Sequence, residues 1–319
     1  MDLREKAGPQ KAADLPERER FGENMKCILI TGASGQLGLA LYRQLEGQIR
    51  YRILRTGSRG SEDGSVQALD ITDEAEVERY MDENRPDIII NCAAFTAVDL
   101  CESQEENAYR VNALGAKYLA LAAERTGAKL VHVSTDYVFD GQAAKPYTEE
   151  EPTNPISAYG RTKEAGEHFV RENCSKYYIV RTAWVYGEGK NFVKTMLRLA
   201  ESGNQLRVVM DQYGTPTSAL ELARAILFLI ETDAYGIYHT TCEGSTNWYE
   251  FALAIFQAAG LEVPVEPIPT SEYPTPARRP MYSILDNKAL RERHGYYMKD
   301  WEDAFYEFMD EEGLLTGQK

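Results

Sequence analysis

Short hydrophobic runs alternate with helical patterns over the first 190 residues of this 319-residue chain. The runs are nearly continuous in apolar residues, which is typical of strands buried on both faces of a sheet. They predict strands at residues 25–31, 51–55, 87–92, 129–134 and 177–182. The stretches between them predict helices at residues 36–46, 73–84, 104–126 and 156–173.

Strand–helix alternation of this kind forms a doubly wound parallel sheet with helices on both faces. After residue 190 the pattern becomes mostly helical, with proline-containing segments between helices at residues 191–202, 218–231, 247–259 and 300–312. We therefore predict an α/β protein with a Rossmann-like domain at residues 25–190. A smaller, mostly helical lobe should follow at residues 191–319.

Residues 1–24 differ from the rest of the chain. They contain eleven charged residues and no apolar periodicity. Such a segment cannot bury enough apolar surface to offset the entropy of ordering, and it lacks the hydrophobic stretch of a signal peptide. We expect a disordered leader, with the fold starting at Met25.

Composition narrows the class of protein. Lys and Arg number 35 and Asp and Glu number 50, which gives a net charge of −15 and argues against nucleic acid or anionic membrane as a partner. The five cysteines are scattered without a Cys-x-x-Cys pair, as expected of reduced thiols in a cytoplasmic protein. The four histidines show no ligand spacing, so we expect no metal site.

A glycine-rich loop, Thr31-Gly32-Ala33-Ser34-Gly35-Gln36-Leu37-Gly38, directly follows the first predicted strand and opens a helix. In such loops the first glycine allows the tight turn, the second lets backbone approach a diphosphate, and the third lets helix and strand pack closely. The helix N-terminus then faces the diphosphate with free N–H groups. The spacing resembles the extended branch of the short-chain dehydrogenase/reductase superfamily.

The end of the second predicted strand bears on the choice of cofactor. Residues 51–59 contain Arg55 and Arg59 but no Asp or Glu. An acidic residue there would hold the ribose 2′-hydroxyl of NAD, whereas arginine accommodates a 2′-phosphate. We expect NADPH, with NADH still possible. In the extended branch, the position of Asp70 meets the adenine.

Tyr159 and Lys163 lie four residues apart in a predicted helix, so they share one face. A free tyrosine has a pKa of about 10 and is a poor acid or base near neutrality. A neighbouring cation stabilises the phenolate and lowers that pKa, so we expect Lys163 to tune Tyr159. Together with a dinucleotide loop, the pair indicates hydride transfer.

Five further motifs occur in order and resemble the dTDP-4-dehydrorhamnose reductase family over the chain from Met25 to about Trp301. They are Asn91-Cys92-Ala93-Ala94-Phe95-Thr96-Ala97-Val98-Asp99, Ser134-Thr135-Asp136-Tyr137-Val138-Phe139-Asp140-Gly141, Arg181-Thr182-Ala183-Trp184-Val185-Tyr186-Gly187, Asp211-Gln212-Tyr213-Gly214-Thr215-Pro216-Thr217 and Ala277-Arg278-Arg279-Pro280.

The resemblance implies a role for each matching residue. Tyr159 would be the proton donor and Lys163 would hold the nicotinamide ribose, while Thr135 would hydrogen-bond the C4 oxygen of the substrate. Asp136, Trp184 and Arg279 would contact the dTDP-sugar. The cofactor would be bound by Gly35-Gln36-Leu37, Asp70-Ile71 and Ala93-Ala94-Phe95-Thr96.

Two departures from related sequences sharpen this reading. Sugar-nucleotide dehydratases carry Thr-Asp-Glu where this chain has Thr135-Asp136-Tyr137, so dehydration is disfavoured. Some family members form a metal-bridged dimer through an acidic residue on the helix after the glycine loop. This chain has Leu39-Ala40-Leu41 there, and we expect a monomer or weak homodimer without that metal.

Three functions therefore remain open. The leading one is NADPH-dependent reduction of dTDP-4-dehydro-L-rhamnose to dTDP-L-rhamnose. A reductase of another dTDP-4-keto-6-deoxyhexose would use the same motifs. A non-enzymatic alternative is a dinucleotide-binding regulatory subunit, since the family also resembles the β subunit of methionine adenosyltransferase.

Overall fold

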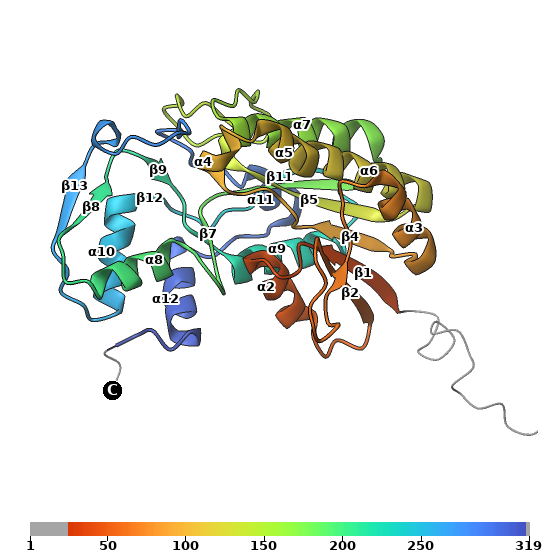
Figure 1. Ribbon diagram of the computed structural model, residues 1–319, viewed down its shortest axis with the longest axis horizontal. Helices are drawn as coiled ribbons and strands as arrows, with labels where there is room; N and C mark the ends of the chain where they lie inside the picture. Colours follow the sequence, from red (N-terminus) through yellow and green to blue (C-terminus); the bar gives the residue numbers. More distant parts are fainter. Residues whose placement is uncertain (1–24, 317–319) are drawn as a thin grey trace, which may run out of the picture.

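A seven-stranded sheet forms the larger part of the protein in the computed structural model, which describes residues 25–316. The expected leader at residues 1–24 lies outside the described residues. Across the sheet the strands are β11 (Gly236–His239), β6 (Tyr177–Thr182), β5 (Lys129–Thr135), β4 (Ile88–Asn91), β1 (Lys26–Thr31), β2 (Tyr51–Gly57) and β3 (Gln67–Ala68). Every neighbouring pair is parallel, which confirms the predicted sheet (Figure 1).

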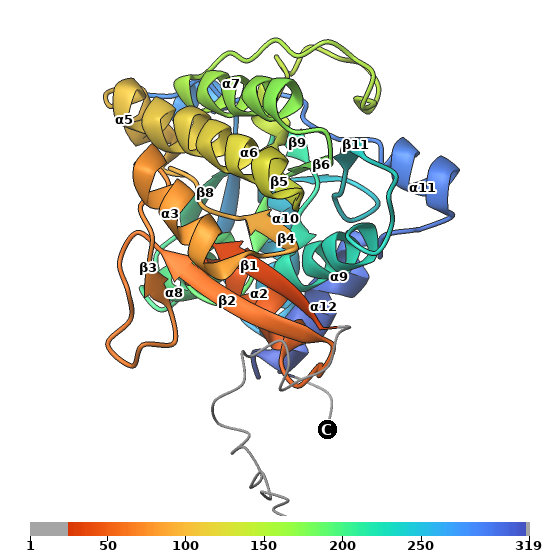
Figure 2. The ribbon, with the colours of Figure 1, turned by 90° about the vertical axis from the view of Figure 1, so that its right-hand side faces the viewer.

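Helices cover both faces of this sheet (Figure 2). On one face lie α2 (Gln36–Leu45) and α9 (Ala219–Leu229), and on the other lie α3 (Glu74–Asn84), α6 (Gly115–Thr126) and α7 (Ala158–Asn173). Ile28 and Ile30 of β1 pack with the first group, whereas Leu29 packs with the second. Because neighbouring side chains point to opposite faces, burial on both sides explains the continuous apolar run.

The helix predicted at residues 104–126 is interrupted. It divides into α5 (Glu105–Tyr109), a π-helical turn η2 (Arg110–Leu114) and α6. Asn112, within that turn, donates from Nδ2 to Thr162 Oγ1 at 3.0 Å and accepts at Oδ1 from the backbone N–H of Phe95 at 2.7 Å. Wide helical turns of this type often occur at functional sites.

A smaller lobe lies beside one end of the sheet (Figure 1). Its helices are α8 (Phe192–Ala200), α10 (Trp248–Ala258) and α12 (Trp301–Glu311). Short strand pairs join them: β7 (Val185–Tyr186) with β10 (Thr217–Ser218), β9 (Tyr213–Gly214) with β12 (Thr246–Asn247), and β8 (Leu206–Val209) with β13 (Val265–Ile268). The lobe has its own core around Tyr186, Phe251 and Phe305.

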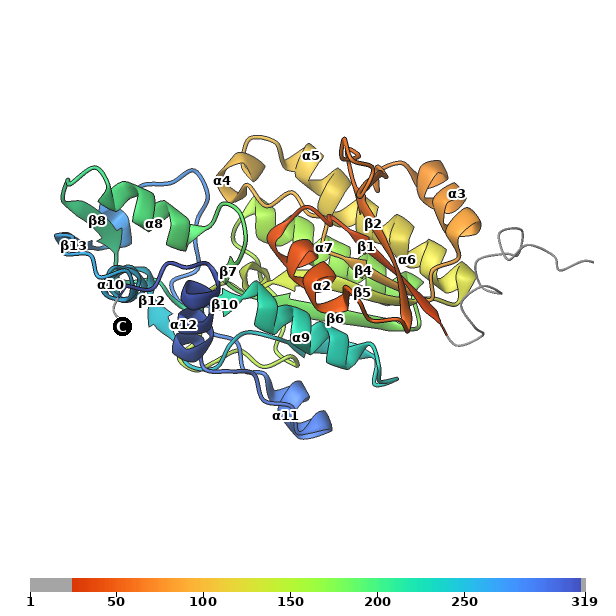
Figure 3. The same cartoon turned by 90° about the horizontal axis from the view of Figure 1, so that it is seen from below.

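The expected division at residue 190 needs correction, because the chain returns to the sheet after that point. Helix α9 packs on α2, where Ile226 and Leu41 belong to one core cluster, and Figure 3 shows the two helices side by side. Strand β11 then pairs with β6, from Gly236 beside Tyr178 onward. Four residues of strand are too short for a periodic signal to be read from sequence.

Candidate active site

The predicted site residues follow the carboxyl ends of four neighbouring strands. The glycine loop follows β1, residues 93–96 follow β4, Thr135 ends β5, and Trp184 comes two residues after β6. These ends meet at one edge of a parallel sheet, and the strand order reverses at β1, which lies between β4 and β2. Open α/β sheets bind their ligands at such a point.

The glycine loop leaves no room for side chains at two positions. Gly32 has a φ of +64°, and a Cβ there would lie 2.7 Å from the backbone nitrogen of Ala93. A Cβ on Gly38 would lie 2.6 Å from Cα of Ala33. The first glycine therefore allows the loop to pass close to the residues after β4, and the third allows α2 to pack on the loop.

The N-terminus of α2 is prepared for an anion. Gly35 is its N-cap, and no side chain caps the free N–H groups of the first turn. Gly35 is exposed and Leu37 packs into the core, so the loop presents backbone to the solvent. Gln36 Oε1 is buried and lacks a hydrogen-bond partner. The uncapped N–H groups fit the diphosphate of a dinucleotide, which supplies negative charge and acceptor oxygens, whereas the Gln36 oxygen needs a hydrogen-bond donor.

The two arginines near the end of β2 are held differently. The guanidinium of Arg55 lies 4.0 Å from the ring centroid of Tyr42, and its Nε is buried without a hydrogen-bond partner. Arg59 is exposed. Arg55 is therefore fixed in place, while Arg59 is free to move toward an anion.

The other residues expected near the adenine have mixed environments. Asp70 is exposed and accepts hydrogen bonds from the backbone N–H and the hydroxyl of Thr72, at 2.9 and 2.8 Å. The side chain of Ile71 is buried against Gly115. Helix α3 is capped by Asp73, which leaves the Asp70 carboxylate available to a ligand.

The segment after β4 is fixed by the π turn. Asn112 accepts from Phe95 N–H and also donates to the Phe95 carbonyl at 3.2 Å. Ala93, Ala94 and Phe95 are half-buried and Thr96 is exposed. Two hydrogen bonds with the buried Asn112 side chain thus hold Phe95 in place, within the segment that the sequence predicts to bind the cofactor.

Tyr159 lies in the first turn of α7. Ser157 caps this helix by accepting from Gly160 N–H at 3.1 Å. Burial raises the pKa of Tyr159, and a side-chain hydrogen bond with Thr135 opposes that rise. The structure therefore brings the predicted proton donor and the predicted oxygen-binding threonine together.

Lys163 lies one turn further along α7 and is 2% exposed. Its Nζ donates to the carbonyl of Val133 at 2.7 Å. Burial lowers the pKa of Lys163 to about 8, against the opposing charge of Glu167. The ammonium is thus anchored to β5 and titrates close to neutral pH.

The predicted tuning of Tyr159 by Lys163 is not observed. The pKa of Tyr159 is raised rather than lowered, because burial of the phenol outweighs the hydrogen bond with Thr135. The Lys163 ammonium is instead bound to a backbone carbonyl. A raised pKa keeps the phenol protonated, which is the state that a proton donor requires.

Asp136 is buried beside Thr135. Its Oδ1 accepts from Thr135 Oγ1 at 3.0 Å, while its Oδ2 has no hydrogen-bond partner. Burial raises the pKa of Asp136 to about 6, although hydrogen bonds with Ser283 and Thr135 partly oppose this. An unpaired buried carboxylate oxygen is costly, so it indicates a position that a ligand hydroxyl can fill.

Trp184 and Arg279, predicted to contact the substrate, are already paired within the protein. Trp184 has a φ of +47° and stacks on Trp248 with ring centroids 3.5 Å apart. Arg279 donates to Asp99 Oδ2 at 2.8 Å and to the Tyr137 hydroxyl at 3.2 Å. Positive φ in a bulky residue is uncommon and is often found at functional sites.

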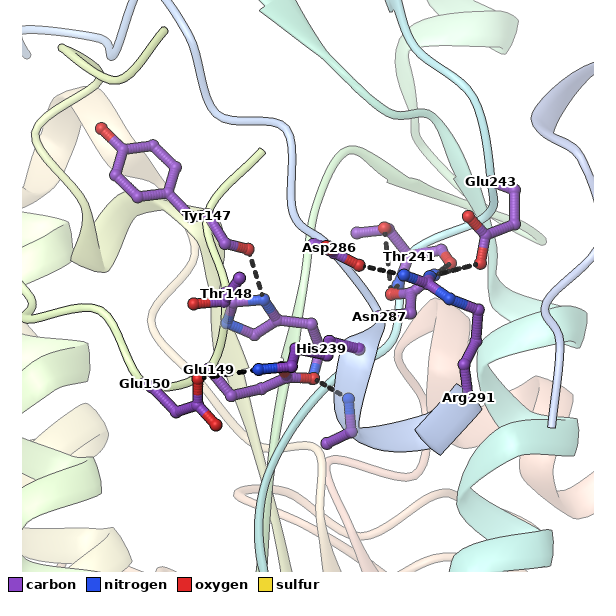
Figure 4. A network of polar contacts seen from close by, with 12 residues as sticks. Tyr147, Thr148, Glu149, Glu150, His239, Thr241, Glu243, Asp286, Asn287 and Arg291 are labelled. Carbon is purple, nitrogen blue, oxygen red and sulfur yellow. Dashed lines mark hydrogen bonds and ion pairs between the residues drawn. The ribbon is translucent and has the colours of Figure 1, made fainter. Parts of the chain in front are cut away.

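The loop between Thr135 and Tyr159 is fastened to the sheet edge (Figure 4). The Glu149 carboxylate accepts from the backbone N–H groups of His239 and Ala289, at 3.1 and 3.0 Å. The Tyr147 carbonyl lies 3.0 Å from His239 Nδ1. These bonds give the loop a fixed path, so both of its ends present their side chains in defined positions.

Sequence reasoning missed several residues that shape the site. The sequence marks Tyr137 only as a departure from dehydratases, and Asp99 only as part of a motif. Asn112 and Trp248 were not singled out. Each acts through a partner distant in sequence, such as Trp184 for Trp248, and no local pattern marks such a contact.

Two features are absent from residues 25–316. No group of three or more His, Cys, Asp or Glu side chains in this part of the chain could hold a metal ion. None of its helices is long and apolar enough to cross a membrane.

Comparison with known proteins agrees with the geometry. The model of the RmlD substrate binding domain family matches residues 25–313. The dTDP-4-dehydrorhamnose reductase of Aggregatibacter actinomycetemcomitans is 41% identical, over 88% of this chain and 97% of its own. The spore coat polysaccharide biosynthesis protein SpsK of Bacillus subtilis is 42% identical, over 90% and 98%.

A solved structure is also similar. The dTDP-4-dehydrorhamnose reductase of Bacillus anthracis, in complex with NADP, has a TM-score of 0.85 and 43% identity and covers 90% of this chain and 99% of its own. The matches span nearly the whole described fold, including the glycine loop and the Tyr159 helix. The chain belongs to the RmlD substrate binding domain family, and its resemblance to the dTDP-4-dehydrorhamnose reductases is confirmed.

Proposed function

We propose that this protein reduces the C4 ketone of dTDP-4-dehydro-L-rhamnose to the hydroxyl of dTDP-L-rhamnose, with NADPH as the reductant. The observation that carries the proposal is that Thr135, at the end of β5, and Tyr159, in the first turn of α7, lie at the strand edge that also holds the glycine loop. A reduction at carbon needs a proton for the oxygen, and these two hydroxyl groups supply and stabilise it.

The cofactor would bind along the carboxyl edge of β1, β2 and β4. When bound, NADPH supplies the hydride. Gly32, Gly35 and Gly38 bring backbone to its diphosphate, and Gln36 and Leu37 open the helix that faces it. Its remaining contacts would come from Asp70, Ile71 and residues 93–96. NADP in the Bacillus anthracis relative supports this assignment.

The 2′-phosphate would be read by arginine. Arg59 is exposed and can close onto it, while Arg55 presents an unpaired, buried Nε from its place on Tyr42. Charge-assisted hydrogen bonds of this type favour NADPH over NADH without excluding NADH.

In the reaction, Tyr159 would donate its proton to the C4 oxygen as the hydride arrives at C4. Thr135 would hydrogen-bond the same oxygen and stabilise the developing charge. Lys163, anchored on Val133, would hold the nicotinamide ribose. Protonation and charge stabilisation of this kind each contribute about 10²–10⁴-fold to rates.

The sugar nucleotide would contact four side chains. Asp136 would use its unpaired Oδ2 for a sugar hydroxyl, next to Thr135. Trp184 would offer an aromatic face, and Arg279 would offer its guanidinium. We further propose that the protein acts in the cytoplasm as a monomer or weak homodimer.

Two alternatives share these features. SpsK, whose name states only spore coat polysaccharide biosynthesis, leaves room for reduction of another dTDP-4-keto-6-deoxyhexose. A dinucleotide-binding regulatory subunit would keep the glycine loop but would not need a buried Asp136 carboxylate oxygen free for a ligand.

The test is to incubate the purified chain with NADPH and dTDP-4-dehydro-L-rhamnose. Loss of the reduced-nicotinamide absorbance, with dTDP-L-rhamnose identified by NMR, is the expected result. Turnover of another dTDP-4-keto-6-deoxyhexose in its place would support the second reductase. Tight NADPH binding without turnover of either sugar nucleotide would support the regulatory subunit.

A further inference from the structure

Tyr137 connects the proposed proton donor with a segment from the far end of the chain. Its ring meets the ring of Tyr159 edge-on, with centroids 5.6 Å apart and planes at 74°. Its hydroxyl accepts a hydrogen bond from Arg279 Nη1 at 3.2 Å. The Tyr159 ring therefore packs against the Tyr137 side chain, which Arg279 in turn holds in place.

The backbone of Tyr137 also touches the helix that carries Tyr159. The residue lies in the short helix η3 (Asp136–Val138) that follows β5. A Cβ on Gly160 would collide with the Tyr137 carbonyl oxygen, so the first turn of α7 rests directly on this backbone. Ring and carbonyl together make Tyr137 the immediate support of Tyr159.

Arg279 is anchored in turn by Asp99 of α4 (Val98–Cys101). Arg279 Nη2 donates to Asp99 Oδ2 at 2.8 Å, and Asp99 Oδ1 accepts from the backbone N–H of Ala277 at 3.2 Å. The side chains of Arg279 and Asp99 are 25% and 41% exposed. Asp99 therefore fastens residues 277–279 to the sheet domain at a place that solvent and ligands can reach.

These contacts form one continuous series: Asp99, Arg279, Tyr137 and Tyr159. A change at its outer end can reach the proton donor through the Tyr137 ring. Misplacement of a catalytic group by about 1 Å can cost about 100-fold in rate, so the support of Tyr159 matters for the reaction.

We propose that Tyr137 is a positioning residue for Tyr159, and that Arg279 and Asp99 hold Tyr137 so that seating of residues 277–279 on α4 aligns the proton donor. The inference rests on the proposed function, in which Tyr159 donates the proton. It gives Arg279 a role through Tyr137, in addition to the contact with substrate proposed above.

The test compares Tyr137→Phe, Asp99→Ala and the double variant, using NADPH and dTDP-4-dehydro-L-rhamnose. Tyr137→Phe keeps the ring but loses the bond with Arg279, and should lower kcat by about 5- to 20-fold with the KM for NADPH unchanged. Asp99→Ala should lower kcat by about 3- to 10-fold. The double variant should be no slower than Tyr137→Phe, because both act through one series of contacts.

The matched control is Glu105→Ala. Glu105 forms a two-bond pair with Arg161, at 2.9 Å for each bond, and so links α5 with α7 without touching Tyr137. This variant should keep the wild-type kcat. The solvent deuterium isotope effect on kcat should rise in Tyr137→Phe, because protonation becomes slower, and should not rise in the control.

A wild-type kcat in Tyr137→Phe, or independent multiplying effects in the double variant, would overturn the inference. If Tyr137→Phe does not fold, Arg279→Gln with Asp99→Ala makes the same comparison. Tyr159→Phe, measured in parallel, separates the two proposals. An inactive Tyr159→Phe beside a normal Tyr137→Phe rejects only the positioning role, whereas a fully active Tyr159→Phe rejects the proposed function as well.

Discussion

The two halves of the site are prepared in different ways. On the cofactor side, backbone N–H groups, Gln36 Oε1 and Arg55 Nε await partners. On the predicted substrate side, Asp136 Oδ2 also lacks a partner, but Arg279 and Trp184 are already bound by neighbouring side chains. The first half is rigid and can accept a ligand as it stands, whereas the second must exchange internal contacts for ligand contacts. Substrate binding is therefore the step at which the protein can couple recognition to chemistry.

The rigidity of the cofactor half is tested most severely at Gly38. Gly38→Ala places a Cβ 2.6 Å from Cα of Ala33, so the loop and α2 must separate. We expect the Kd for NADPH to rise by about 10- to 100-fold in fluorescence titrations. Gly127→Ala is the control, since it strains a left-handed turn in open space and should lower Tm without changing the Kd. Equal Kd values in both variants would show that the loop is not a rigid cradle.

The burial of Asp136, on the predicted substrate side, can be tested through the free energy of unfolding. Its pKa is raised to about 6 by burial, so its ionised form destabilises the fold. The folded state binds the proton more tightly than the unfolded state, and stability is therefore lost as the pH rises from about 4 to 6. Asp136→Asn should abolish this loss and be about 2–3 kcal/mol more stable at pH 7, but less active.

Urea unfolding of both proteins between pH 4 and 7 measures the difference. It should be smallest at pH 4 and reach its full size above pH 6. A difference that does not depend on pH would mean that the Asp136 carboxyl does not titrate in this range.

Titration of Lys163 should be visible in the pH dependence of kcat/KM. Burial lowers its pKa to about 8, so the free enzyme loses the ammonium as the pH rises through that value. We expect kcat/KM to fall about tenfold for each further pH unit, if the charge is needed for catalysis. A kcat/KM that stays level from pH 7 to 10 would contradict this role.

The smallest expected effect concerns the 2′-phosphate. Replacing both Arg55 and Arg59 with alanine should lower kcat/KM for NADPH about tenfold more than for NADH. Arg59→Ala alone should give the part of this loss that comes from the exposed arginine, because Arg55 is already stacked on Tyr42. An unchanged NADPH/NADH ratio would show that neither guanidinium contacts the phosphate.

Sequence patterns predicted those features whose residues lie close together along the chain. The strands β1 and β4 are nearly continuous apolar runs because both of their faces are buried. The glycine loop and the Tyr159–Lys163 spacing are equally local in sequence. Strand β11 and the π turn escaped prediction because one is four residues long and the other depends on Asn112 meeting Phe95 and Thr162.

The substrate half was harder to predict for the same reason. Asp99 and Arg279 lie 180 residues apart in sequence, and only the fold brings them together. The pKa of Tyr159 also depends on burial, which spacing along a helix does not reveal. Motifs single out the residues predicted to react, but the contacts that hold them required the structure.

Tyr159→Phe tests the central claim most directly. The variant retains the ring beside Tyr137 and lacks only the hydroxyl that would protonate the C4 oxygen. Stopped-flow measurement of NADPH oxidation with dTDP-4-dehydro-L-rhamnose should show a rate lower by about 10²–10⁴-fold. The Kd for NADPH should stay within about twofold of wild type, since the cofactor half is untouched. Turnover at the wild-type rate would contradict the assignment of Tyr159 as the proton donor.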